Sequence, residues 1–238
     1  MAQVINTNVS SLFAQQALNR SNNHLQTAMQ RLSSGMRINS AKDDPTGLVT
    51  ATTYDSQIRG ANMAYRSVND AISVAQTNDG YMGQIVENMQ RIREIAVQQG
   101  GTASSTEATR LVTENARIVG LITAPTATVI DTAGTTMTGS GVAPAAPVAL
   151  GVAAIDAEFV TINASRATMG ADMAVFGSIA SNLGVQSVNL SAAYSRVMDT
   201  DYAVETTNMT RNQILQQAGT AMLAQANQIP NSVLTLLK

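Results

Sequence analysis

Residues 155–197 read IDAEFVTINASRATMGADMAVFGSIASNLGVQSVNLSAAYSRV, and they contain the clearest periodic pattern of the chain. From Ile155 onward every seventh residue is apolar, as far as Val197. Seven residues make almost two turns of an α-helix, so these side chains form one stripe that needs an apolar partner. We therefore predict a long helix over about 153–198, packed as in a coiled coil. The predicted rod core is Ile155, Ile162, Met169, Phe176, Leu183, Leu190 and Val197.

Residues 45–99 show a second long pattern of the same period. One apolar row consists of Val68, Ala75, Met82, Met89 and Ala96, and a second consists of Ile58, Tyr65, Ile72 and Val86. Asp79 interrupts the second row, as Arg166 interrupts the pattern of the later helix. Asp44 and Pro45 suit the start of a helix, and Gly100 and Gly101 suit its end. We predict a helix over about 45–99.

Between the two long helices the pattern becomes less regular. A shorter helix is predicted over about 105–123, followed by a loop or hairpin over about 124–151, where Thr, Ala, Gly and Pro replace the helical period. The predicted fold class is all-α dominated. It is an elongated antiparallel helical bundle or coiled coil with paired terminal helices and a short irregular or β-hairpin insertion.

Both ends of the chain carry apolar stripes and almost no acidic side chains. All 16 acidic residues lie between Asp43 and Glu205. We predict that two helices pair through these stripes, with domain bounds of 1–42 and 206–238 for the two halves of the terminal domain and 43–205 for the rod. Pro230 should kink or break the last helix near Gln228. The predicted assembly interface is Leu18, Leu25, Met29, Leu32, Leu215, Met222, Ala226, Ile229, Val233 and Leu236.

Several classes of function are disfavoured by composition. A net charge of −2 gives no case for binding nucleic acid. No apolar run reaches the roughly 18 residues of a membrane span, and there is no cysteine. The single histidine, His24, has no neighbouring ligands, and the adjacent Asp43 and Asp44 are better explained as helix caps than as acid-base groups. We expect neither an enzyme nor a cofactor.

Several long segments resemble bacterial flagellins. They are LQTAMQRLSSGMRINSAKDDPTGL near the start, SQIRGANMAYRSVNDAISVAQTNDGYMGQIVENMQRIREIAVQ after it, IDAEFVTINASRATMGADMAVFGSIASNL, and NLSAAYSRVMDTDYAVETTNMTRNQILQQAGTAMLAQANQIPNSVLTLLK at the end. The resemblance covers about residues 1–115 and 153–238. It implies a minimal flagellin without large outer domains, which polymerises into the extracellular flagellar filament for swimming. It also implies terminal segments that become ordered helices on polymerisation.

The resemblance further implies particular partners. These are other copies of the chain, the flagellar type III export apparatus with an export chaperone, and the cap and junction proteins. Some flagellins are recognised by a host toll-like receptor, and the matching positions here are Gln90, Arg91, Glu94, Ile95 and Glu114, with Asn115 as the alternative to Glu114. Two other functions remain open on the residues alone: a hook-filament junction protein and a coiled-coil scaffold or signalling protein.

Overall fold

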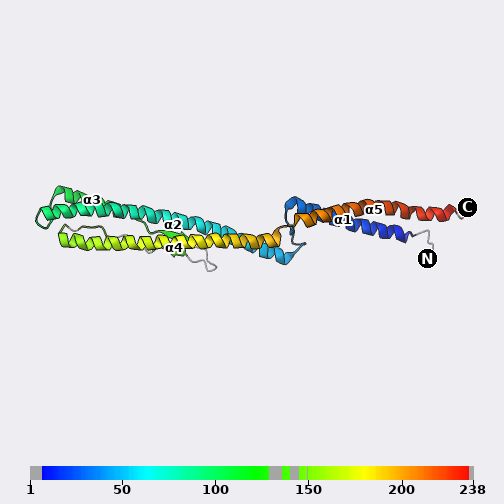
Figure 1. Cartoon of the computed structure of the whole chain (residues 1–238), viewed down its shortest axis with the longest axis horizontal. Helices are drawn as coiled ribbons and strands as arrows, with labels where there is room; N and C mark the ends of the chain where they lie inside the picture. Colours follow the sequence, from blue (N-terminus) through cyan, green and yellow to red (C-terminus); the bar gives the residue numbers. More distant parts are fainter. Residues whose placement is uncertain (1–6, 129–135, 140–144, 149, 236–238) are drawn as a thin grey trace. The chain divides into compact units, whose positions relative to one another are not determined.

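The structure is a computed structural model that describes the backbone of residues 7–128, 136–139, 145–148 and 150–235. Side chains are described over the same ranges except at 128, 136, 137 and 229–235. The elements are α1 (Val9–Ser34), α2 (Pro45–Gln98), α3 (Thr106–Val119), β1 (Thr126–Thr128), β2 (Thr136–Thr138), α4 (Val152–Met198) and α5 (Tyr202–Thr235) (Figure 1). The predicted fold class, dominated by helices with paired terminal helices and a short hairpin, is confirmed.

The chain divides into two compact units. Residues Met1–Tyr54 and Ala192–Lys238 form one, called here the terminal unit, and Asp55–Ser191 form the other, called the central unit. The long helices α2 and α4 each contribute to both units.

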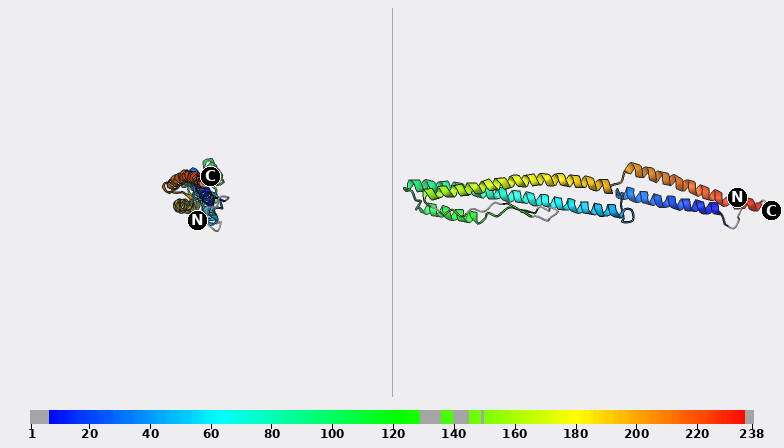
Figure 2. Two further views of the ribbon diagram at one scale, coloured as in Figure 1. Left: turned by 90° about the vertical axis from the view of Figure 1, so that its right-hand side faces the viewer. Right: turned by 90° about the horizontal axis from the view of Figure 1, so that it is seen from below.

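In the central unit α2 and α4 run side by side in opposite directions (Figures 1 and 2). One face of α2 is buried over its whole length in this unit, at spacings of three and four residues. Its members are Ala64, Val68, Ala71, Ala75, Asn78, Met82, Ile85, Met89, Ile92 and Ala96, each at most 2% exposed. This face, called here the α2 seam, packs against Ile155, Ile162, Met169, Phe176 and Leu183 of α4, all of which are buried.

The α2 seam corrects one of the two rows expected from the sequence. The row from Val68 to Ala96 is buried. Of the second row, Ile58, Ile72 and Val86 are half-buried beside the seam, with Ile72 and Val86 packed against the core clusters, and Tyr65 is 45% exposed. Alanines occupy the seam where α4 presents the larger Phe176 and Leu183, because small side chains leave room for large ones.

The segment between the long helices packs against α2. Ala108 and Ile118 of α3 lie in the same apolar cluster as the seam residues from Met82 to Ala96. Gly100 and Gly101 have φ angles of 82° and 118°, which residues with a side chain rarely adopt. These two glycines turn the chain away from α2. Gly101 then accepts a hydrogen bond from the backbone N–H of Val152 at 3.3 Å, which joins this turn to the start of α4.

Strands β1 and β2 form an antiparallel hairpin in which Thr126 faces Thr138. Residues 129–131, which follow β1 in the chain, lie outside the described residues.

In the terminal unit α1 and α5 lie side by side and antiparallel (Figure 2). Gly35 ends α1 with a left-handed φ of 71°, and its N–H donates to the carbonyl of Arg31. The chain then passes Met198, whose carbonyl accepts from the N–H of Arg37 at 2.6 Å, before α2 begins. Ile38, Ala51 and Met198 form a small buried cluster beside this connection.

Of the kink or break expected near Gln228, the break does not occur, since α5 continues through Pro230 to Thr235. The kink stays a prediction. Proline has no N–H to donate to the carbonyl four residues earlier, which belongs to Ala226. That carbonyl instead accepts a hydrogen bond from Asn8 Nδ2 at 2.8 Å. The side chain of one terminal helix therefore satisfies the backbone group that proline leaves free in the other.

Candidate assembly surface

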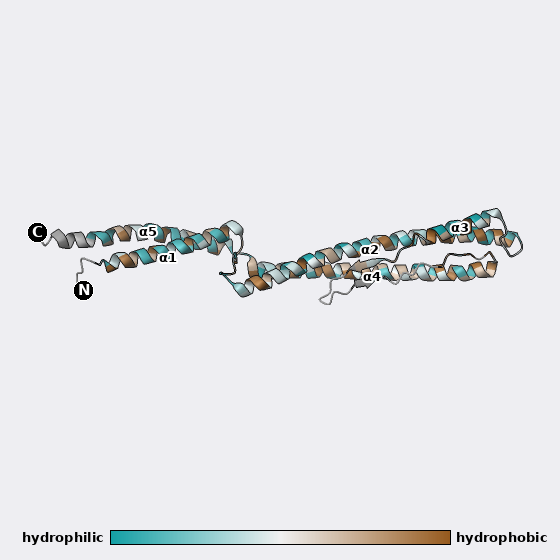
Figure 3. Ribbon diagram, turned by 180° about the vertical axis from the view of Figure 1, so that it is seen from behind, coloured by the Kyte–Doolittle hydropathy of each residue, from teal (hydrophilic) through white to brown (hydrophobic). Residues whose placement is uncertain are grey.

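An apolar groove of about 730 Å³ lies between α1 and α5. Val9, Phe13 and Leu18 line it from α1, and Leu215 and Met222 line it from α5, with alanines and Gly219 at its floor. Several of these side chains are exposed in the single chain: Phe13 by 73%, Met222 by 64% and Leu215 by 48%. Brown apolar positions alternate with teal polar ones along both helices in Figure 3. A contiguous exposed apolar surface of this kind is typical of a protein contact site.

The residues predicted for the assembly interface fall into two groups. Leu18, Leu25 and Leu32 of α1 are half-buried, and Ala226 of α5 is buried against α1. In contrast, Met29, Leu215 and Met222 are exposed, so they are not used by the contact between α1 and α5. Ile229 and Val233 lie in α5, but their side chains are outside the described residues, as is the whole of Leu236. Their assembly role stays a prediction.

The face that α5 turns toward α1 is more polar than the predicted stripe. Its half-buried positions include Met209, Asn212, Gln216 and Leu223, at spacings of three, four and seven. Gly219 lies against Leu18, because a β-carbon built at Gly219 would be 3.3 Å from Leu18 Cδ1. Leu215 and Met222 of the predicted stripe therefore lie beside this half-buried face and are exposed in the single chain.

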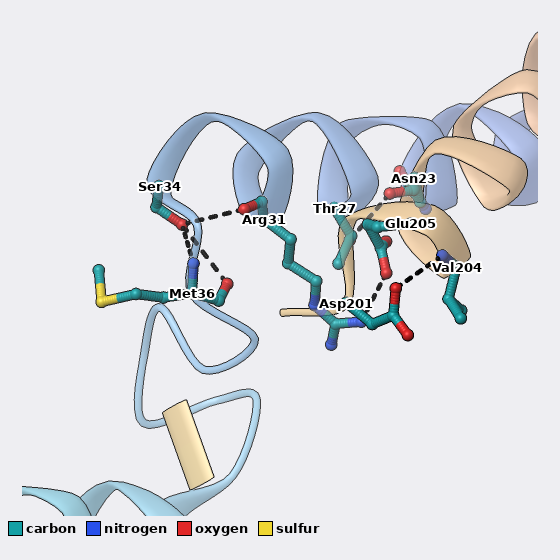
Figure 4. Close-up of polar contacts among 8 residues, drawn as sticks. All are labelled: Asn23, Thr27, Arg31, Ser34, Met36, Asp201, Val204 and Glu205. Atoms are coloured by element: carbon teal, nitrogen blue, oxygen red, sulfur yellow. Dashed lines mark hydrogen bonds and ion pairs between the residues drawn. The ribbon is translucent and has the colours of Figure 1, made fainter. Parts of the chain in front are cut away.

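Arg31 of α1 and Glu205 of α5 form an ion pair that sequence reasoning missed. Arg31 Nη1 lies 3.8 Å from Glu205 Oε2, and the two side chains point toward each other across the helix pair in Figure 4. Glu205 is only 7% exposed, and Arg31 Nε is buried with no hydrogen-bond partner among the described residues. The available signal was that Glu205 is the last acidic residue of the chain.

Asn8 is the second polar residue that sequence reasoning missed. Its Oδ1 accepts from the N–H of Ser11 at 3.1 Å and so caps α1, while its Nδ2 reaches the Ala226 carbonyl. The position of Asn8 before an apolar helix was a signal for the cap, whereas the second contact depends on folding.

Two aspartates organise the connection between α1 and α2. Hydrogen bonds from the backbone N–H groups of Asn39 and Ser40 hold the pKa of Asp43 below its usual value. The N–H of Gly47 does the same for the pKa of Asp44, with help from the Thr46 hydroxyl and N–H. Both carboxylates therefore act as backbone acceptors, Asp44 at the start of α2.

The predicted rod core lies mostly inside the structure. Ile155, Ile162, Met169, Phe176 and Leu183 are buried in the central unit, whereas Leu190 and Val197 are half-buried. The apolar row thus becomes more exposed toward the C-terminal end of α4.

The positions proposed for a receptor contact differ in accessibility. Gln90, Arg91 and Glu94 are exposed, but Ile95 is 5% exposed and packs in the core, so its side chain does not reach solvent. Arg91 Nε bonds Glu107 at 2.9 Å and its Nη1 bonds Glu94 at 3.1 Å, which raises the pKa of Arg91.

The alternative between Glu114 and Asn115 is also clarified. Asn115 is fully buried and accepts from Asn88 Nδ2 at 2.8 Å, whereas the half-exposed Glu114 is bonded to Arg117. That bond lowers the pKa of Glu114. Of the two side chains, only that of Glu114 reaches the surface.

Other kinds of site find no basis in the described ranges. No three His, Asp or Glu side chains there are grouped so as to hold a metal ion. None of the helices over those residues combines the length and hydropathy needed to cross a bilayer.

Comparison with known proteins decides the family. A family model described as the bacterial flagellin N-terminal helical region matches residues 5–126, and one described as the C-terminal helical region matches residues 152–237. The chain belongs to the flagellin family. These matches include α1, α2 and α3 on one side and α4 and α5 on the other.

Two relatives of this flagellin match almost its whole length, and a third matches less than half of it. The flagellin of Xenorhabdus nematophila is 36% identical over 100% of both chains. The flagellar filament 30.7 kDa core protein of Treponema maltophilum is 31% identical over 98% of this chain and 99% of its own. A flagellin of Salmonella typhimurium is 51% identical over 105 residues, which cover 44% of this chain and 21% of that protein. This flagellin is accordingly a structural subunit of the bacterial flagellar filament and serves motility.

Proposed function

We propose that the groove between α1 and α5 is the polymerising surface of this filament subunit. The observation that carries the proposal is the exposure of Phe13, Leu215 and Met222 beside one another on a helix pair. Burying such side chains against neighbouring subunits yields about 1.5–3 kcal/mol for each fully buried large side chain. A subunit exposes this surface, and a filament would cover it.

Charge supports the same surface. Residues 1–42 contain no acidic side chain, and α5 contains only Glu205, which is buried. Neighbouring terminal helices can therefore approach without removing unpaired carboxylates from water, which would be costly. A contact between different surfaces of successive copies that does not close on itself produces a helical filament.

The terminal helices are proposed to gain their order during assembly. A helix with one apolar face is unstable in water unless that face is packed. Here part of the packing comes from the partner helix and the rest, through the groove, from other subunits. Folding of α1 and α5 and growth of the filament are then coupled.

The further partners and the location follow from the family resemblance. The chain is proposed to be secreted through the flagellar type III export apparatus with an export chaperone. It would then meet the cap and junction proteins outside the cell. Its role is structural, without catalysis.

The test changes one groove residue in the full chain. Met222→Asp should abolish polymerisation, because a carboxylate would be buried between subunits, while the thermal unfolding of the central unit stays unchanged. Met222→Leu keeps an apolar side chain and should polymerise. Filaments are counted by electron microscopy and light scattering. Normal filaments from Met222→Asp would exclude the groove as the polymerising surface.

A receptor contact is proposed at Gln90, Arg91, Glu94 and Glu114. Its support is the exposure of Arg91 and Glu94 on one face of α2. The guanidinium of Arg91 would have to exchange its bond to Glu107 for a receptor group. Arg91→Ala should reduce activation of cells that express the toll-like receptor, whereas Arg93→Ala, which removes the bond to Asp156, should not. Equal responses from both variants would reject this site.

A further inference from the structure

We infer that two polar contacts, Arg31 with Glu205 and Asn8 with the Ala226 carbonyl, set the register in which α1 and α5 pair. The inference rests on the proposed polymerising role of these helices for its functional meaning, but its structural content stands by itself. It makes Arg31, Glu205 and Asn8 positioning residues for filament assembly.

The apolar side chains of the two helices do not define one alignment. Leu18, Leu25 and Leu32 repeat every seven residues on α1, and the face that α5 turns toward α1 contains two rows of the same period, Asn212, Gly219 and Ala226, and Met209, Gln216 and Leu223. A slip of seven residues along either helix, about 10 Å, brings each member of a row to the place of the next. The side chains of these rows are small or flexible, so their shape offers little that would oppose such a slip.

The charged side chains permit only one of these alignments. Glu205 is the one acidic residue of the sequence of α5, and α1 contains two arginines, Arg20 and Arg31. A slip of seven residues moves Glu205 either toward His24 or past the end of α1 at Ser34. Both alignments separate the carboxylate from the Arg31 guanidinium, and an unpaired charge in a buried position is strongly unfavourable.

The contact at the other end of the pair imposes the same alignment. Pro230 has no N–H to donate to the Ala226 carbonyl four residues earlier, and Asn8 Nδ2 donates to this carbonyl at 2.8 Å. Asn8 is itself held in place because its Oδ1 caps α1. A slip in either direction removes this hydrogen bond together with the ion pair.

The ion pair is loose in the single chain. Its atoms are 3.8 Å apart, and Arg31 Nε has no partner among the described residues, so the guanidinium makes less than its full set of bonds. Removal of Arg31 still leaves the Glu205 carboxylate, whose side chain is only 9% exposed, buried without its partner. The pair therefore selects an alignment more effectively than it tightens the contact.

The absence of cysteine from the sequence allows the register to be measured by disulfide formation. A β-carbon at Gly219 would lie 3.9 Å from Leu18 Cβ, within the range that a disulfide requires. Leu18→Cys with Gly219→Cys reports the observed register. Leu18→Cys with Asn212→Cys, or with Ala226→Cys, reports the two alignments slipped by seven residues.

The experiment oxidises each pair of cysteines in the full chain under polymerising conditions and measures the intramolecular crosslink on gels. Without further changes, the pair at 18 and 219 should exceed both slipped pairs at least about tenfold, which corresponds to about 1.4 kcal/mol. Adding Arg31→Gln and Asn8→Ala should bring the three yields within about twofold of one another. The reciprocal change Arg31→Glu with Glu205→Arg should restore the preference.

Two results would overturn the inference: equal yields for the three pairs in the otherwise unchanged chain, or an unchanged preference in the Arg31→Gln, Asn8→Ala background. The crosslink ratio is obtained whether or not a variant polymerises. Failure of the groove proposal would appear instead as normal filaments from Met222→Asp, so the two ideas can fail separately.

Discussion

Arg166 of α4 forms a two-pronged ion pair with Asp79 of α2, with Nε 2.8 Å from Oδ1 and Nη2 3.3 Å from Oδ2. Each of these residues interrupts the apolar pattern of its own helix. The two interruptions therefore meet one another in the antiparallel pair. Because apolar rows of period seven tolerate a slip of seven residues, this pair also marks the alignment of α2 with α4.

The Arg166 and Asp79 pair should contribute modestly to stability. Both side chains are more than a third exposed, so solvent screens their attraction. Asp79→Ala with Arg166→Ala should show a coupling free energy of about 0.5 kcal/mol in a double-mutant cycle from urea unfolding. The cycle for the more exposed Asp55 and Arg59, neighbours on α2, should give a smaller value. A coupling of zero for the first pair would contradict this account.

Asn78 should stabilise the central unit, although it is a polar residue in the α2 seam. It is 1% exposed in the α2 seam, donates to the Thr123 carbonyl at 2.5 Å and accepts from the Thr123 N–H at 3.4 Å. Asn78→Ala should lower the free energy of unfolding by about 1–3 kcal/mol and speed hydrogen exchange at Thr123, because both backbone groups lose a partner. Asn69→Ala, at an exposed amide of the same helix, is the control and should change little.

The free energy of unfolding of the central unit should depend strongly on the side chain of Phe176 and only weakly on that of its neighbour Val175. Phe176 is 2% exposed, whereas the adjacent Val175 is 48% exposed. Phe176→Ala should cost about 3–5 kcal/mol, because it removes apolar burial and leaves a cavity. Val175→Ala should stay within about 0.5 kcal/mol. Calorimetry that finds similar losses for the two variants would show that α4 is packed differently from the description above.

Asn8 donates to the carbonyl to which Pro230 cannot donate, so the effect of changing Asn8 should depend on which residue is at position 230. Asn8→Asp keeps the acceptor that caps α1 but loses the donor to the carbonyl, and should raise the critical concentration for polymerisation about fivefold, as expected for a hydrogen bond of about 1 kcal/mol. In a Pro230→Ala background the alanine N–H can serve the same carbonyl, so Asn8→Asp should have a smaller effect. Equal effects in both backgrounds would refute the link between the two residues.

Acid should weaken the connection between α1 and α2. Hydrogen bonds lower the pKa of Asp43 and Asp44 in the folded chain, so each carboxylate stabilises the fold above its unfolded pKa of about 3.9. That contribution is lost as the pH falls below about 4 and through the lower folded values. Arg31 for Asp43 and Arg37 for Asp44 add a smaller attraction of the same sign.

The measurement is the thermal unfolding midpoint between pH 7 and pH 2. The doubly changed chain Asp43→Asn, Asp44→Asn should be less stable than the unchanged chain at pH 7 and should show a flatter decline below pH 4. A decline of the same steepness in both chains would assign the acid sensitivity to other carboxylates.

The amino-acid pattern alone was enough to predict which segments are helices and which of their faces are apolar. The apolar residues from Ile155 to Val197 are seven positions apart, and a helix places residues at this spacing on one face. The geometry of a single helix is therefore enough to predict the helix and its apolar face. The clustering of acids between Asp43 and Glu205 likewise marked the terminal helices without any knowledge of contacts. The second row expected on α2 lies at the edge of the seam, where Ile72 and Val86 are half-buried, and not at its centre. The same reasoning missed Ala64 and Ala71, because an alanine contributes little to an apolar pattern even where it lies in the cluster of Phe176.

Which residues of distant helices meet became known only from the folded chain. A row with a period of seven residues looks the same after a shift of seven residues, so the apolar rows do not fix how two helices are aligned. The alignment is fixed by contacts between polar groups: Asp79 with Arg166, Glu205 with Arg31, and Asn8 with the Ala226 carbonyl. Each contact joins groups 87 or more positions apart in the chain, and its energy exists only when both arrive at the same place.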